Sequence, residues 1–113
     1  MFCVGDIIYT KKQYVGCSYY YDFAIVEKIT PTGRFRIRPI EKESGERIEM
    51  RLPSGAIFAI QQTVKPLPNL KYGYFYLLNK KGERRGKDTP TWGCYYEKYN
   101  DELDLKDYID CGD

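Results

Sequence analysis

The sequence predicts a mainly β protein made of one domain, and three observations support this. The chain has 113 residues, which suits one compact domain, because two halves of about 55 residues would each bury too little surface. Residues that favour strands are abundant, whereas alanine occurs at only three positions. Turn residues separate short alternating segments over residues 4–67, as in small β-barrels and sandwiches. We therefore expect a barrel core over residues 4–67, an appended long aromatic hairpin over residues 70–99 and a short acidic segment over residues 100–113.

The first predicted strands cover residues 6–10 and residues 20–29, with a polar loop between them. In the longer strand, alternate residues fall on opposite faces, which is the period-two pattern of a sheet. The sequence Thr-Pro-Thr-Gly follows at residues 30–33. Proline presets φ and glycine permits a positive φ, so a tight turn is expected there.

Two further segments alternate in the same way, at residues 34–40 and 47–52. In the first, Phe35 and Ile37 face one side, and three arginines face the other. Residues 56–61 fit either a strand or a single helical turn, and residues 63–67 fit a short strand that ends between prolines.

The C-terminal part contains two aromatic segments, residues 71–79 and 91–99, separated by a basic, glycine-containing stretch. We expect them to pair as one long hairpin. In the acidic end, Asn100 or Asp101 could cap a helical turn. The spacing of Leu103 and Leu105 suits a short strand equally well.

Three stretches resemble an SH3-like barrel of the KOW/Tudor type. They are VGDIIY at residues 4–9, YDFAIVEKIT at residues 21–30 and GRFRIR at residues 33–38. In such barrels Gly-Asp opens the first strand, and a V-x-K-I-T-x-x-G stretch leads into the third. The variant with Tyr-Asp-Phe is similar to small, largely uncharacterised bacteriophage proteins. The resemblance covers about residues 4–67 and implies a binding module for RNA, DNA, proteins or modified peptides, although no peptide-reading aromatic cage can be transferred residue by residue.

The charges are unevenly distributed along the chain. The net charge of +2 hides a basic segment, residues 61–87, which carries seven lysines and arginines against Glu83 alone. Residues 88–113 carry eight acidic against two basic side chains. Local patches steer partners more than the total does, so the basic segment is the better candidate for an anionic ligand.

Catalysis is not indicated, and we expect no cofactor. The chain has no histidine, which removes the commonest general base and metal ligand, and no phosphate-binding or nucleophile motif is present. No metal site is expected either, because the four cysteines form no CxxC pair. We expect them to be reduced thiols in the cytoplasm, of a host cell if the protein is viral, since no export signal or membrane span is visible.

The predicted ligand site combines the basic stretch with the aromatic segments beside it. Cations there would hold phosphates, and aromatic rings would stack on bases. The alternatives are a solvated turn and core packing, which should account for about half of the rings. The candidate ligand-binding residues are Lys80, Lys81, Arg84, Arg85, Lys87, Tyr72, Tyr74, Tyr76, Trp92 and Tyr95.

A secondary set of candidates lies in the predicted barrel. Arg34, Arg36 and Arg38 could line a nucleic-acid groove, although pairing with Glu49 and its acidic neighbours on the next strand is the favoured explanation. Tyr20 and Asp22 could form the rim of a pocket that binds a base or a cationic side chain, although strand propensity explains them more simply.

The leading hypothesis is a non-enzymatic binding protein for a nucleic acid or a nucleotide. The alternative is a phage-type counter-defence protein that binds a host protein or sequesters a signalling nucleotide. An enzyme is the least supported reading. The exposed edges of the predicted hairpin could also pair across a twofold axis to form a homo-oligomer.

Overall fold

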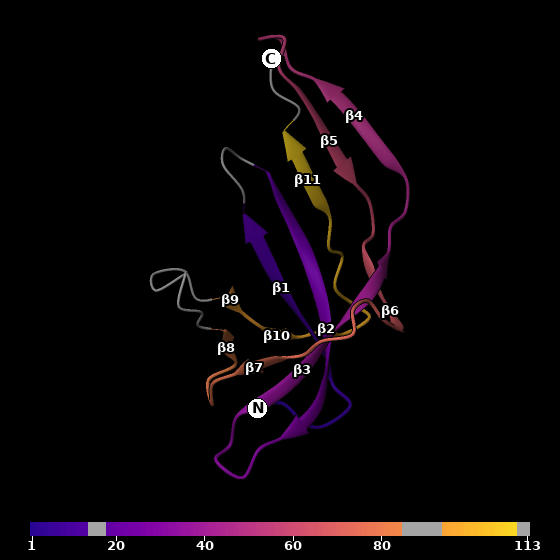
Figure 1. Cartoon of the computed structure of the whole chain (residues 1–113). Helices are drawn as coiled ribbons and strands as arrows, with labels where there is room; N and C mark the ends of the chain where they lie inside the picture. Colours follow the sequence, from indigo (N-terminus) through magenta and orange to yellow (C-terminus); the bar gives the residue numbers. More distant parts are fainter. Residues whose placement is uncertain (14–17, 85–93, 111–113) are drawn as a thin grey trace.

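The computed structural model describes residues 1–13, 18–84 and 94–110, and these residues form strands, turns and loops without a helix (Figure 1). The prediction of a mainly β protein is confirmed. No described segment is a helix that could cross a membrane. The strands are β1 (Ile7–Gln13), β2 (Tyr19–Ile29), β3 (Phe35–Glu43), β4 (Arg47–Arg51), β5 (Ile57–Gln61), β6 (Lys65–Leu70), β7 (Tyr76–Leu78), β8 (Glu83–Arg84), β9 (Cys94–Tyr95), β10 (Glu97–Lys98) and β11 (Asp107–Asp110).

Most strands belong to one curled sheet that resembles half of a barrel. Its order is β10-β1-β2-β11-β5-β4, and β3 branches from β2 to pair with β6 and β7. All of these pairs are antiparallel. The SH3-like assignment of residues 4–67 stays a prediction.

The sheet carries a hydrophobic cluster on each face, because β2 presents apolar residues in both alternating positions. On one face Ala24 and Val26 join a buried cluster with Ile8, Ile37 and other residues of β1, β3 and β7. On the other face Phe23 packs in a second cluster that includes residues from the loops after β5 and β10. The predicted turn at residues 30–33 joins β2 to β3, and Gly33 has a φ of +85° there.

The prediction of one long aromatic hairpin over residues 70–99 is wrong. β7 pairs with β3, so that Leu78 lies opposite Phe35, and β10 pairs with β1. Among the described residues of the predicted hairpin, only the two-residue strands β8 and β9 pair with each other. Leu78 is fully buried in the first cluster, and burying its side chain on β3 outweighs local pairing between the two aromatic segments.

Both segments with an open assignment contain strands. Residues 57–61 form β5 and not a helical turn. In the acidic end, Asn100 Oδ1 accepts a hydrogen bond from the amide of Glu102 at 3.0 Å, which caps a turn, and the chain then continues into β11. The Leu105 side chain is buried in the second cluster, so this end contributes to the core.

The strands β4, β5 and β11 form an arm that extends from the rest of the sheet (Figure 1). Within the described residues, β11 pairs with β2 at one position, Tyr108 with Tyr19. Side chains strengthen this junction: Lys42 Nζ lies 2.7 Å from Asp107 Oδ2, and the amide of Tyr21 donates to Asp107 Oδ1 at 2.9 Å. Within the predicted barrel core, β4 therefore sits on an outer edge and is exposed along its whole length.

Candidate functional site

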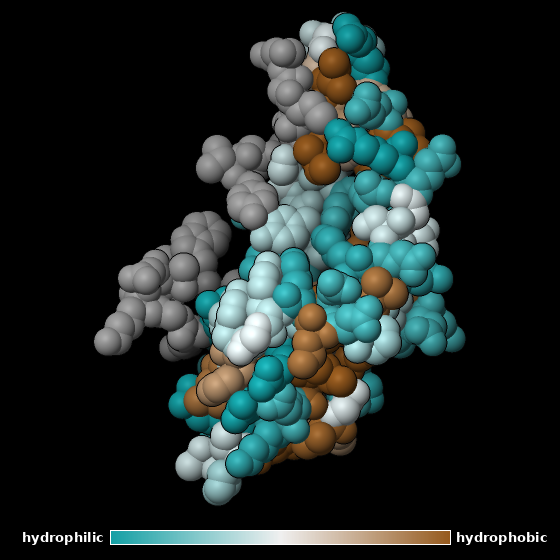
Figure 2. Space-filling view, turned by 45° about the vertical axis from the view of Figure 1, so that its right-hand side comes forward, coloured by the Kyte–Doolittle hydropathy of each residue, from teal (hydrophilic) through white to brown (hydrophobic). Residues whose placement is uncertain are grey.

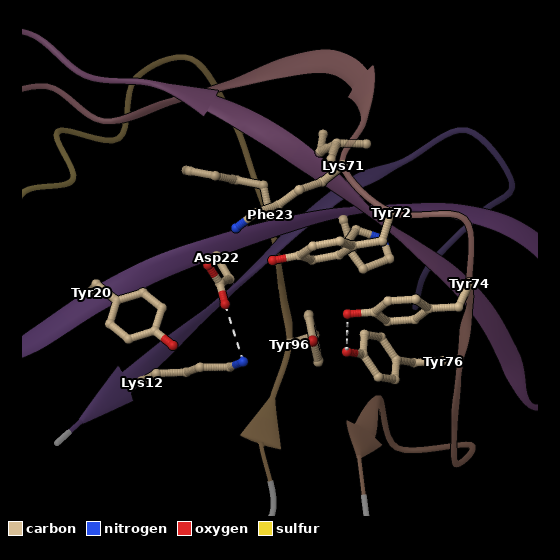
Figure 3. A pocket seen from close by; sticks show the side chains of 12 residues that line it. Lys12, Tyr20, Asp22, Phe23, Lys71, Tyr72, Tyr74, Tyr76 and Tyr96 are labelled. Atoms are coloured by element: carbon tan, nitrogen blue, oxygen red, sulfur yellow. Dashed lines mark hydrogen bonds and ion pairs between the residues drawn. The ribbon is translucent and has the colours of Figure 1, made fainter.

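A pocket of about 220 Å³ lies between the start of β2 and the loop that joins β6 to β7 (Figure 3). Lys12, Tyr20 and Asp22 line one side, and Tyr72, Tyr74 and Tyr76 line the other. Tyr96 lies at the back, in contact with the first cluster. We call this the tyrosine pocket.

Tyr72 and Tyr74 of the loop and Tyr76 of β7 form an ordered aromatic wall. The rings of Tyr72 and Tyr74 are stacked, with centroids 4.9 Å apart and an interplanar angle of 11°. The ring of Tyr76 stands edge-on to Tyr74, at 5.3 Å and 84°. Figure 3 shows the hydroxyl groups of all three rings pointing into the pocket, away from the loop backbone.

The backbone of the loop explains this arrangement. β6 and β7 both pair with β3, so residues 71–75 cross between them along the same strand. The amide of Lys71 donates to the Pro39 carbonyl at 2.9 Å, which fixes the start of the loop. Phe75 points to the other side, where the Arg36 guanidinium lies 3.8 Å from its ring centroid. Of the three tyrosines, only Tyr76 belongs to a strand, whereas Tyr72 and Tyr74 lie in the loop.

Cations surround the rings of the pocket. The Arg84 guanidinium lies 3.7 Å from the Tyr76 centroid, and Lys71 Nζ lies 5.2 Å from the Tyr72 centroid. On the side of the pocket that faces these tyrosines, Lys12 Nζ pairs with Asp22 Oδ2 at 3.1 Å. Among the lining residues Asp22 is the single carboxylate, so the surroundings are net positive.

The hydroxyl of Tyr74 is a neutral hydrogen-bonding group. It accepts from the Tyr76 hydroxyl at 3.3 Å. The neighbouring Tyr76 hydroxyl, together with desolvation, raises the pKa of Tyr74 to about 12. The Tyr74 hydroxyl is therefore an uncharged hydrogen-bonding group at neutral pH.

The structure brings only part of the predicted site together. Tyr72, Tyr74 and Tyr76 line the tyrosine pocket, as do the secondary candidates Tyr20 and Asp22. Arg84 does not line the pocket but lies over the ring of Tyr76. Arg85, Lys87 and Trp92 lie outside the described residues.

Three other predicted residues lie elsewhere. Lys80 and Lys81 line a separate hollow beside Phe2, and the Lys80 side chain lies close to Gly33. Tyr95 is 66% exposed and borders another hollow near Tyr9. These residues do not line the tyrosine pocket.

Arg36 and Arg38 pair with a carboxylate of the protein, but it is not the predicted Glu49. Arg36 Nε lies 3.1 Å from Glu27 Oε1, and Arg38 pairs with the other oxygen of the same carboxylate. Pairing with Glu49 is wrong, because β3 pairs with β2, β6 and β7, whereas β4 pairs with β5. Arg34 is exposed at the turn before β3.

Two residues that line the pocket, Lys12 and Lys71, were not predicted from the sequence. Lys12 lies directly opposite Tyr20 in the β1–β2 register, but the first strand was predicted to end at residue 10, which left Lys12 in the predicted polar loop. Lys71 precedes Tyr72 in the chain, so its position beside the ring was a local signal. Across the described residues, no cluster of histidine, cysteine or acidic side chains could hold a metal ion.

No family model matches this sequence, and no curated protein or solved structure is detectably similar to the chain.

Proposed function

We propose that this protein binds a nucleic acid or a nucleotide in the tyrosine pocket without catalysing a reaction. The observation that carries the proposal is the stacked pair of Tyr72 and Tyr74, which are 43% and 46% exposed beside cations. A stacked aromatic pair that opens to solvent can extend its stack onto a planar base, and such stacking contributes about 1–3 kcal/mol per base.

The hydroxyl groups support a base as the planar part of the ligand. Ligand pockets typically combine apolar walls with a few convergent polar groups that fix orientation. Here the phenol oxygens of the aromatic wall point into the pocket (Figure 3). Lys12 adds a hydrogen-bond donor, and Asp22 adds an acceptor. The edge of a nucleobase carries matching acceptors and donors.

The cations support an anionic ligand over a cationic one. An aromatic cage for a cation needs free ring faces. In this pocket Arg84 already lies over Tyr76, and Lys42 Nζ lies 5.2 Å from the Tyr20 centroid. A phosphate near Arg84 and Lys71 would gain from these charges, whereas a second cation would be repelled.

The size of the pocket favours a single base. Its volume of about 220 Å³ lies below the roughly 300–1,000 Å³ of typical small-molecule sites. One nucleotide unit would fill it, and the rest of a longer strand would lie outside. We therefore expect single-stranded nucleic acid or a free nucleotide to bind better than a duplex.

Titration with labelled single-stranded oligonucleotides and with mononucleotides and cyclic dinucleotides tests the proposal. Tyr72→Ala should weaken binding about tenfold, because one stacking surface is lost. Tyr95→Ala is the matched control, since this tyrosine is exposed outside the pocket, and it should leave affinity unchanged.

The electrostatic half of the proposal needs its own pair of variants. Lys71→Glu should weaken binding and reduce the slope of affinity against salt concentration, whereas Lys65→Glu on exposed β6 should change both less. If no oligonucleotide or nucleotide binds at low salt, or if Tyr72→Ala binds as well as the unmodified protein, the proposal is wrong. Retained capture of a host protein by the same variants would then favour the alternative of a protein target.

A further inference from the structure

The outer edge of β4 carries a sequence pattern that is unused within the described chain. β4 ends the strand order of the sheet, and no other described strand pairs with its free side. All five of its residues are exposed, among them Ile48 at 38% and Met50 at 45%. Leu52, directly after the strand, is 44% exposed. Figure 2 shows hydrophobic surface interspersed with hydrophilic surface at this upper end of the molecule.

The backbone of β4 determines which of its groups are free. The amide of Leu52 donates to the Ala56 carbonyl, and the amide of Gln62 donates to the Glu46 carbonyl, both at 2.9 Å. Even-numbered residues of this strand therefore form the hydrogen-bonded pairs with β5, as antiparallel ladders alternate. The amides and carbonyls of the odd-numbered residues, 47, 49 and 51, point to the free edge.

We propose that β4 pairs antiparallel with β4 of a second copy of this chain, with Met50 opposite Met50 of that copy. The twofold axis would stand perpendicular to the sheet, so each face continues from one copy into the other. In this register Glu49 lies opposite Arg51 of the second copy, and these odd-numbered residues exchange their free backbone hydrogen bonds. Ile48 lies opposite Leu52 of the second copy on the apolar face.

The charges of β4 reject the register centred on Glu49. That register would place Glu49 opposite its own copy and Arg47 opposite Arg51, and like charges directly opposite one another are destabilising. The edge is protected against pairing in that register, as natural edge strands often are. In the register centred on Met50, Glu49 and Arg51 each lie opposite a residue of opposite charge in the second copy.

A third register, centred on Ile48, also pairs opposite charges but matches the faces poorly. It would place Arg47 opposite Glu49 of the second copy, and Glu46 opposite Met50 on the apolar face. The register centred on Met50 sets apolar against apolar there. In that register Pro53, which has no amide hydrogen, lies opposite Arg47 and ends the ladder.

Analytical ultracentrifugation of charge variants tests the association. The unmodified chain should dimerise weakly, with a Kd on the order of 10–100 µM, because a short edge contact lies at the low end of interface size. Glu49→Arg alone and Arg51→Glu alone should each weaken dimerisation roughly tenfold or more, because like charges then face each other at both symmetric contacts. An equimolar mixture of the two variants should form heterodimers, because every facing pair is again of opposite charge.

Arg47→Glu is the matched control, and it should change the dimer Kd by less than about threefold, because Arg47 has no charged residue opposite it. Stronger dimerisation of this variant would indicate the register centred on Glu49, and a tenfold loss would indicate the one centred on Ile48. Either result, or a monomeric unmodified chain at millimolar concentration, overturns the proposal. Circular dichroism of each variant establishes that the fold is intact.

Cross-linking measures the register directly. Under mild oxidation, Met50→Cys should give a disulfide-linked dimer above the background of the unmodified chain, because directly opposite residues of a non-hydrogen-bonded pair lie about 4.5 Å apart at Cα. Ile48→Cys should not, since its symmetry mate lies several residues along the strand. The opposite pattern of cross-linking would contradict the proposed register.

Discussion

The two faces of the β1–β2 sheet carry the same residue type in different roles. On one face, rings contact one another in a continuous series that we call the aromatic ladder. It runs through Phe58, Tyr108, Tyr19, Tyr21, Tyr9, Tyr99 and Phe23. On the other face, the tyrosine pocket leaves a stacked pair open to solvent.

The difference lies in what covers each face. The loop before β6 and residues 99–105 close over the inner part of the aromatic ladder, where Phe23 is 2% exposed. The Tyr9 hydroxyl donates to Glu97 Oε2 at 2.8 Å, so the polar atom is satisfied within the protein. In the tyrosine pocket the hydroxyls point into an open space. Covered rings stabilise the fold, and uncovered rings are available to a ligand.

The largest difference between the faces should appear in stability. Phe23→Ala should lower the free energy of unfolding by about 3–5 kcal/mol, because it leaves a cavity beside the edge-on ring of Tyr99. Tyr74→Ala should leave the unfolding midpoint unchanged but weaken ligand binding. Urea denaturation followed by circular dichroism measures both, and Phe23→Leu serves if the alanine variant does not fold. An equal loss of stability in Phe23→Ala and Tyr74→Ala would contradict this difference between the two faces.

A smaller loss is expected at the junction between the arm and the rest of the sheet. Asp107→Ala should destabilise the protein by about 2–3 kcal/mol, because it leaves the Tyr21 amide without this acceptor and the Lys42 ammonium with the Tyr21 carbonyl but no carboxylate. Thermal unfolding measures this loss. Asp104→Ala is the control, since its contact with Lys106, at 3.4 Å, is exposed and should contribute little. A neutral result for Asp107→Ala would mean that the strand pairing of β11 holds the arm without this contact.

The pH dependence of stability should distinguish Tyr9, a tyrosine of the aromatic ladder, from the tyrosines of the pocket. Burial, followed by the hydrogen bond to Glu97, raises the pKa of Tyr9 to about 12 from 10.0. The folded state therefore keeps the proton that the unfolded state loses first, so this contribution to stability is complete below pH 10 and is lost as the pH rises toward 12. Unfolding measured across this window should show a weaker pH dependence for Tyr9→Phe than for the unmodified chain. An identical slope would contradict the assignment.

The smallest effect should be spectroscopic and confined to the tyrosine pocket. In Tyr76→Phe, the pKa of Tyr74 should fall from about 12 toward 10, because the neighbouring Tyr76 hydroxyl is the main cause of its shift. Ultraviolet titration of phenolate formation measures this change. Glu97→Gln, by comparison, should lower the pKa of Tyr9 only in part, since burial remains. An unchanged titration in Tyr76→Phe would place the cause of the shift elsewhere.

Local patterns predicted the strands well where one residue in two is apolar. Phe35 and Ile37 are buried and Arg36 and Arg38 face the other side, as the alternation of residues 34–40 predicts. The turn at residues 30–33 followed from proline and glycine chemistry. Such features depend on neighbours in the chain, so the sequence contains them directly.

Pairing between distant segments could not be predicted in the same way. Residues 71–79 and 91–99 looked complementary, yet they pair with β3 and β1, which already hold buried apolar faces. The ligand set was predicted as a basic loop with its flanking rings, but Lys80 and Lys81 diverge from the tyrosines because their turn packs beside Phe2. Which charges meet which rings depends on how the chain returns to the sheet.

The sequence by itself therefore determined the β class, the strand faces and the residue types of the candidate site. The tertiary structure alone decided that Tyr72 and Tyr74 stay open while Tyr9 and Tyr21 are half-buried against the second cluster, and that Lys12 and Lys71 join the pocket. The physical reason is that alternation fixes which side of a strand a ring occupies. Whether that side is buried depends on hydrophobic contacts with segments far away in the chain.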